Sequence, residues 1–149
     1  MVDYTIVIGV DLKHLDQLRL VWPTWLAQKP SLMQHSIVIF YDESLEPWEI
    51  RKVVGNVNGI RFHSWPPKRV EYLGNPLNKF DDPQRYKMLA GFVHVPALVV
   101  DTSYWLKLDL DNVAIGMDDW IDENWFKETP GIVAQTWSYT KPPDQMQVL

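Results

Sequence analysis

Short apolar runs alternate with helix-like segments along most of the chain, and this alternation limits the possible folds more than any other feature. Residues 4–10 and 36–41 are rich in β-branched side chains, which is typical of buried strands. Pro23 lies inside the helical segment between them, so the sequence predicts a kink there, or an end and a new start. In that segment apolar residues recur at spacings of three and four, as along one face of a helix: Leu15, Leu18, Trp22, Trp25 and Leu26.

The same signals predict further elements after residue 41. A helix is expected with Ser44 as its cap, Pro47 in its first turn and Gly55 at its end. The remaining predicted elements are a strand at 59–65, a helix from Asp82 that stops before Pro96, strands at 103–109 and 131–137, and a helical stretch at 117–127.

Alternating strands and helices predict crossover connections, which join parallel strands. We therefore expect the α/β class, with a Rossmann-like, mostly parallel sheet and helices on both of its faces. A chain of 149 residues suits one domain, which we expect at 1–140. The remaining residues, 141–149, include two prolines and are predicted to form a loosely ordered tail.

Composition and charge exclude several classes of function. The net charge of -5 argues against a general nucleic-acid binder, because phosphate backbones are bound by basic surfaces. The absence of cysteine excludes disulfides, thiolate zinc sites and cysteine nucleophiles. The N-terminus is acidic where a signal peptide would be basic, and the apolar runs are far shorter than the ~20 residues of a transmembrane helix. We therefore expect a cytoplasmic protein without a transmembrane segment.

Asp109 and Asp111 lie at the end of the predicted strand at 103–109. Side chains two residues apart on an extended chain point the same way, so these two carboxylates are expected to project together. Such a pair repels itself unless a proton or a cation lies between the groups. Its simplest use is to hold Mg²⁺ or Mn²⁺, with positions left open for a phosphate ligand. Asp11 and Asp42 also follow predicted strands, so we expect all these acids at one edge of the sheet.

Four segments of the chain occur in an informative order. They are Gly9-Val10-Asp11 after the first strand, Tyr41-Asp42-Glu43-Ser44 after the second, Arg85-Tyr86-Lys87-Met88-Leu89 on a helix, and Leu106-Lys107-Leu108-Asp109-Leu110-Asp111. In this order the segments resemble the nucleotide-diphospho-sugar glycosyltransferases of the GT-A fold, whose Asp-x-Asp motif is similar to the last one. The resemblance covers about residues 4–137 and is more specific than an isolated Asp-x-Asp.

The resemblance implies metal-dependent binding of a nucleotide-diphosphate sugar and transfer of the sugar to an acceptor that the sequence does not identify. Asp109 and Asp111 would bind Mn²⁺ or Mg²⁺. Arg85 would contact a phosphate or the sugar through its forked guanidinium. Lys87 lies about 200° around the same helix and ranks second for that contact. The nucleoside would be held by the ends of the first two strands, at Val10, Asp11, Tyr41 and Asp42.

Other interpretations stay open. The acids at the strand ends are also suited to capping helices or to lying in solvated turns. Relative to the family, the chain is shortened at its C-terminal side and no histidine follows Asp111, which favours a non-catalytic nucleotide-sugar-binding or interaction domain. Residues 109–113 also fit the first motif of haloacid-dehalogenase-type phosphatases, although that motif normally opens its domain. The sequence indicates neither the catalytic base nor the oligomeric state.

Overall fold

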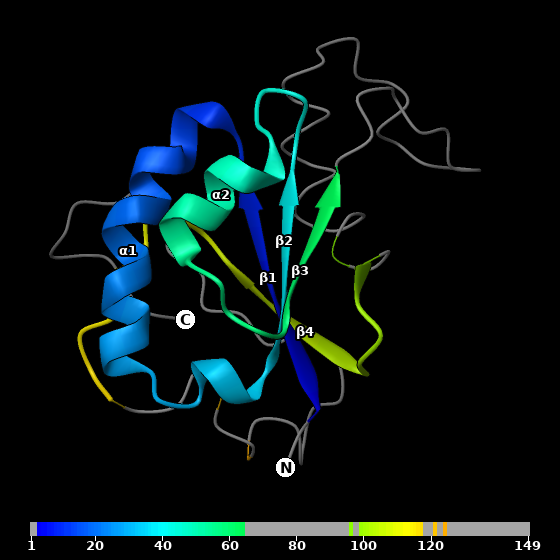
Figure 1. Cartoon of the computed structure of the whole chain (residues 1–149). Helices are drawn as coiled ribbons and strands as arrows, with labels where there is room; N and C mark the ends of the chain where they lie inside the picture. Colours follow the sequence, from blue (N-terminus) through cyan, green and yellow to red (C-terminus); the bar gives the residue numbers. More distant parts are fainter. Residues whose placement is uncertain (1–2, 65–95, 97–98, 118–120, 122–123, 125–149) are drawn as a thin grey trace, which may run out of the picture. The chain divides into compact units, whose positions relative to one another are not determined.

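The computed structural model describes residues 3–64, 96, 99–117, 121 and 124. The helices and strands of these described residues belong to a unit that extends from Val2 to Asp119, whereas the second unit consists of Met1 and Trp120–Leu149. In chain order (Figure 1) the elements are β1 at Tyr4–Val10, the 3-10 turn η1 at Leu12–His14, α1 at Leu15–Gln28, the 3-10 turn η2 at Leu32–Gln34, β2 at Ser36–Tyr41, α2 at Pro47–Val54, β3 at Ile60–Ser64 and β4 at Tyr104–Leu108.

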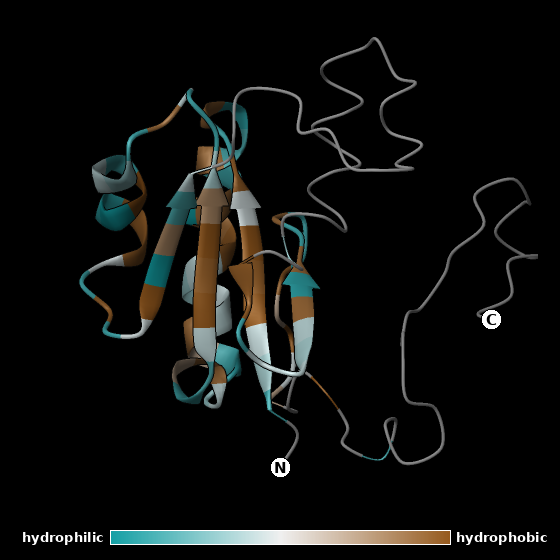
Figure 2. Ribbon diagram, turned by 90° about the vertical axis from the view of Figure 1, so that its right-hand side faces the viewer, coloured by the Kyte–Doolittle hydropathy of each residue, from teal (hydrophilic) through white to brown (hydrophobic). Residues whose placement is uncertain are grey.

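The four strands form one parallel sheet in the order β3-β2-β1-β4. Strand β1 is paired on both edges, with Ile8 opposite Ile39 of β2 and opposite Leu108 of β4. Its side chains are buried on both faces, and Figure 2 shows the central strands as apolar along most of their length. The predicted α/β class and parallel pairing are thus confirmed for these four strands.

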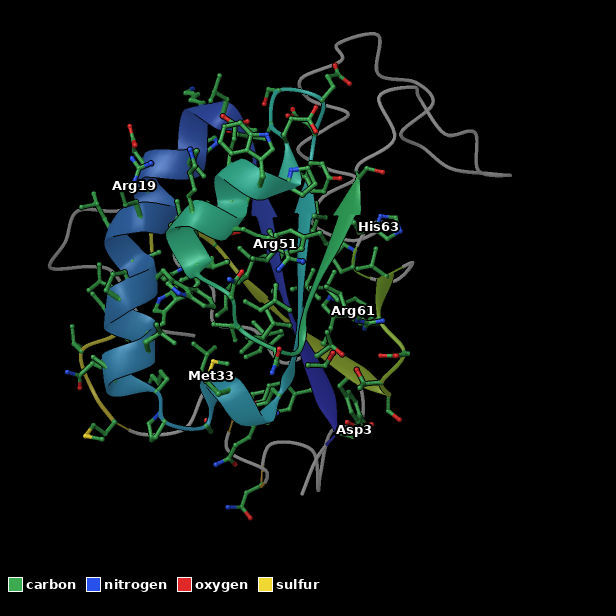
Figure 3. The ribbon with its side chains drawn as sticks, in the orientation of Figure 1. Asp3, Arg19, Met33, Arg51, Arg61 and His63 are labelled. Atoms are coloured by element: carbon green, nitrogen blue, oxygen red, sulfur yellow. The ribbon has the colours of Figure 1, made fainter. Side chains whose placement is uncertain are left out.

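Helices α1 and α2 cover one face of the sheet, and Figure 2 views the sheet from the opposite face. Arg51 of α2, labelled in Figure 3, lies over the ring of Phe62 on β3, with 4.7 Å from the guanidinium carbon to the ring centroid. Trp22 and Trp25 of α1 are buried and meet edge to face, with ring centroids 6.3 Å apart. Their large apolar area anchors α1 in the core.

Helix α1 continues past Pro23 to Gln28, so the end and new start predicted as one possibility at this proline do not occur. The proline ring removes one backbone donor and disfavours the helix locally. Trp22 and Trp25, on either side of it, are both buried in the core. Burial of these two rings outweighs the local preference, as tertiary contacts commonly do.

The opposite face of the sheet has its own apolar cluster, in which the helical residue Val99 packs on Val7, Val38 and Phe40. Pro96 is also helical, and its carbonyl accepts the N–H of Val100 at 3.3 Å. The segment in which the helix from Asp82 is predicted lies before Pro96 and outside the described residues, so its end before Pro96 stays a prediction.

Polar contacts hold the segment that enters β4. The fully buried Thr5 shares a hydrogen bond of 2.8 Å with the hydroxyl of Thr102. Asp101 accepts a hydrogen bond of 3.0 Å from Nη2 of Arg61, near the start of β3. These contacts lie where the strands begin, the end of the sheet at which Figure 3 labels Asp3. They position β4 beside β1 from the end opposite the acidic turns.

Helix α2 begins at Pro47 as predicted, but its cap is Glu46 and the prediction of Ser44 is wrong. The N–H of Glu46 donates to Oε2 of Glu49 at 2.9 Å, and the side chain of Glu46 accepts from the backbone of Glu49, so the two residues form a capping box. Gly55 ends the helix with a positive φ of 79°, a conformation that favours glycine. The hydroxyl of Ser44 is used elsewhere, in the turn described below.

Several predicted elements lie wholly or largely outside the described residues and stay predictions. They are the helix start at Asp82, the helical stretch at 117–127, the strand at 131–137, the domain limit at residue 140 and the tail at 141–149. Within the described part of the chain, no helix has both the length and the apolar character that crossing a membrane requires.

Gly9→Ala should lower the free energy of unfolding by about 1–3 kcal/mol, the usual cost of an overpacked core. A Cβ at this position would lie 2.5 Å from Cζ of the buried Phe40 ring. Urea denaturation measures the loss. Phe40→Leu removes the ring, so the double variant should lose less than the sum of the single losses. Strictly additive losses would show that the ring is not the obstacle.

Candidate functional site

Three acidic residues directly follow three adjacent strands: Asp11 after β1, Asp42 after β2 and Asp109 after β4. Because all the strands are parallel, these residues lie at the same edge of the sheet, as the sequence predicts. The strand order reverses between β1 and β4. The chain leaves β1 toward the face of α1, whereas Val99, shortly before β4, covers the other face. Open α/β sheets commonly bind ligands at such a reversal.

The turn after β1 contains an Asp–His pair. Oδ1 of Asp11 accepts the N–H of His14 at 2.9 Å and lies 2.6 Å from Nδ1 of the same residue. Asp11 therefore caps η1, one of the two roles considered for it from sequence. Because a carboxylate only accepts hydrogen bonds, it favours the tautomer with the proton on Nδ1, which leaves the lone pair of the neutral ring on Nε2.

The turn after β2 is tied to the turn after β1. Oδ1 of Asp42 accepts the N–H of Ser44 at 2.9 Å and also the hydroxyl of Ser44. The same hydroxyl oxygen accepts the N–H of Leu12 at 2.9 Å. An aspartate that bonds its own backbone two residues on forms a common tight turn. Here that turn also fixes the spacing between the two proposed nucleoside-binding turns.

Strand β4 ends at Leu108, before either carboxylate of the Asp-x-Asp sequence. The backbone N–H and the side-chain Nδ2 of Asn112 both donate to the carbonyl of Asp109, at 3.4 and 3.1 Å. Nδ2 also lies 3.2 Å from Oδ1 of Asp111. The prediction of an extended chain through both acids is wrong, because Asn112 closes a turn. A common direction for the two carboxylates therefore does not follow from strand alternation.

Helix α1 anchors this turn. Nε1 of Trp25 donates to the carbonyl of Asn112 at 2.7 Å, and the N–H of Ala114 donates to Oγ1 of Thr24 at 3.3 Å. Leu110, between the two acids, is buried. A buried indole N–H needs an acceptor, and here the acceptor is the backbone of the acidic turn. The core thereby holds the segment that carries Asp109 and Asp111.

Lys107 of β4 forms an ion pair with Oδ1 of Asp109, and the two side chains are 18% and 47% exposed. Lys107 lies opposite Val7 of β1, which belongs to the apolar cluster. Its aliphatic stem therefore begins beside buried apolar residues while its ammonium reaches the carboxylate at the edge. Asp109 thus has a cationic partner two residues away in its own chain.

Two of the acids at this edge could supply part of the coordination of a divalent cation. Asp109 and Asp111 carry the carboxylate oxygens that Mg²⁺ and Mn²⁺ prefer. Among the residues that the structure describes, no group of three or more His, Asp or Glu side chains is arranged to hold a metal. A cation bound by these two residues would need further oxygen ligands, from phosphate or water, to complete its coordination.

Four further residues are predicted to contact the ligand, and the structure describes two of them. Arg85 and Lys87 lie outside the described residues. The side chain of Val10 is buried, so a contact from this residue to a ligand would come from its backbone. Tyr41 ends β2 at the acidic edge and is partly exposed.

His14 and Lys107 are not among the residues that the sequence predicts for this edge. A signal existed for each. His14 stands three residues after a capping aspartate, a spacing at which the two side chains can meet. Lys107 stands two residues before Asp109, and residues with that spacing on a strand share a face.

Comparison of the chain with protein-family models, with curated proteins and with solved structures found no match in any of the three.

Ser44→Ala should lower the free energy of unfolding by about 0.5–1.5 kcal/mol, because the N–H of Leu12 loses its acceptor. The hydrogen-exchange rate of the Leu12 amide, measured by NMR, should rise because this amide loses its acceptor. Ser44→Thr keeps the hydroxyl and serves as the control. Unchanged exchange at Leu12 in the alanine variant would mean that this hydroxyl does not connect the two turns.

Proposed function

We propose that this edge of the sheet binds a nucleotide-diphosphate sugar together with Mn²⁺ or Mg²⁺, as in glycosyltransferases of the GT-A fold. One observation carries the proposal: acidic turns follow β1, β2 and β4 at one edge, where the strand order reverses. That edge is the usual ligand position in such sheets. The Asp-x-Asp sequence after β4 supplies two carboxylates at that position.

Each turn has a part in the proposed site. Asp109 and Asp111 hold the cation, which when bound would offset the charge of the diphosphate as it leaves the sugar. The backbone of Val10 and the side chains of Asp11, Tyr41 and Asp42 hold the nucleoside. The Ser44 bridge between the first two turns keeps that part of the site in one arrangement. Arg85 and, second to it, Lys87 are proposed to contact the phosphates or the sugar.

The proposed activity is transfer of the sugar from this donor to an acceptor, by a protein of the cytoplasm. Asp11 and His14 add a hydrogen-bonded pair at the same edge. With its Nδ1 held by the carboxylate, His14 can offer Nε2 as a hydrogen-bond acceptor for a ligand hydroxyl.

A UDP- or GDP-linked sugar with Mn²⁺ should raise the melting temperature by roughly 5–10 °C at a donor concentration 100-fold above its dissociation constant. The double variant Asp109→Ala plus Asp111→Ala should lose this shift, because it removes both proposed cation ligands. Thermal unfolding of both proteins, with several donors and with or without the metal, measures the difference.

The matched control removes the same charge at the other end of the strands. Asp3→Asn plus Asp101→Asn removes two negative charges near the starts of β1 and β4, keeps an oxygen at position 101 that can accept from Arg61, and should keep the full shift. A folded Asp109/Asp111 double variant that still responds fully to metal and donor would refute the proposed site.

Turnover separates the enzyme from the alternative of a non-catalytic binding domain. Incubation with nucleotide-sugar and Mn²⁺ should release the nucleoside diphosphate, by transfer or by slow hydrolysis, at a rate that the Asp109/Asp111 double variant abolishes. Metal-dependent donor binding without release would instead assign the chain to the non-catalytic alternative.

A further inference from the structure

A partly buried lysine lies where the proposed cation would bind. Lys107 lies opposite Val7, a member of the apolar cluster, and its ammonium pairs with Oδ1 of Asp109. An ammonium with little exposure is stable only with a counter-charge near it. The pair therefore stabilises both partners, and a second cation at Asp109 must compete with the Lys107 ammonium for the same carboxylate.

We propose that the ammonium of Lys107 neutralises Asp109 before a divalent metal binds. When the metal binds Asp109, the ammonium pairs with the diphosphate of the donor instead. This inference rests on the proposed function. Lys107 is a positioning residue in this scheme, because it decides when Asp109 is open to the metal.

The exchange has a thermodynamic consequence. Metal alone must compete with the Lys107 ammonium for Asp109 and lies close to a like charge, so metal binding without a phosphate ligand is weakened. A diphosphate bound at the same time offers anionic oxygens to this ammonium, which offsets the weakening of its pair with Asp109. Metal and diphosphate should therefore each strengthen the binding of the other, and part of this coupling should depend on Lys107.

The first measurement is Mn²⁺ binding without any nucleotide, by electron paramagnetic resonance of the free ion. Lys107→Met keeps the length and apolar character of the stem and should bind Mn²⁺ roughly fivefold more tightly than the natural chain. That factor corresponds to the loss of an ion pair of about 1 kcal/mol. Lys107→Arg keeps the charge and should bind as the natural chain does. Lys107→Gln is a second neutral variant, should the methionine variant fold poorly.

A general loss of positive charge could also favour a cation, so a charge-matched control is needed. Lys13 is exposed in η1, which follows β1 at the same edge of the sheet. Lys13→Met removes one positive charge there and should change Mn²⁺ binding by less than about twofold, since exposed charges at a distance are screened. A gain equal to that of Lys107→Met would overturn the proposal.

The second measurement is the mutual effect of Mn²⁺ and UDP or GDP, by titration calorimetry. In the natural chain each should tighten the other, and in Lys107→Met this enhancement should shrink by a similar factor. One outcome would overturn only the role of Lys107: Mn²⁺ binds the natural chain and not Asp109→Asn, but it binds Lys107→Met no more tightly than the natural chain. If Mn²⁺ binds neither protein, the proposed metal site falls and this inference falls with it.

Discussion

Parallel pairing of β1 with both β2 and β4 is the constraint on which the rest of the structure depends. Ile6, Val7 and Ile8 are fully buried, so the strand is covered on both faces as well as hydrogen-bonded on both edges. Parallel neighbours need crossover connections, and these place α1 and α2 on one face and Val99 on the other. They also bring the carboxyl ends of the strands to one edge, which is why acids far apart in sequence gather there.

The four aspartates at this edge are each engaged by a residue close to them in sequence. The pairs are Asp11 with His14, Asp42 with Ser44, Asp109 with Lys107 and Asp111 with Asn112. Local partners of this kind stabilise carboxylates that parallel packing brings to one edge, and they hold the turns in defined shapes. Binding at such an edge is therefore an exchange of partners, in which a ligand must offer more than the local contacts it displaces.

The residue pattern of a segment predicted its secondary structure best where the segment is buried on both faces. Strands β1 and β2 occupy residues 4–10 and 36–41, as their β-branched composition predicts. At Pro23 the helix does not end and start again, because burial of Trp22 and Trp25 outweighs the local break that proline favours. The cap of α2 is Glu46 and not the predicted Ser44, whose hydroxyl accepts the amide of Leu12 instead. Such competition is decided by residues distant in sequence.

The sequence by itself determined the α/β class, the parallel pairing and the acids that end three strands, because hydrophobic periodicity and strand-end residues are local properties. Only the tertiary structure decided the order β3-β2-β1-β4, the turn that carries Asp109 and Asp111, and the partners of those acids. The physical reason is that these features depend on contacts such as that of Trp25 with Asn112, between residues brought together only when the sheet and α1 have packed.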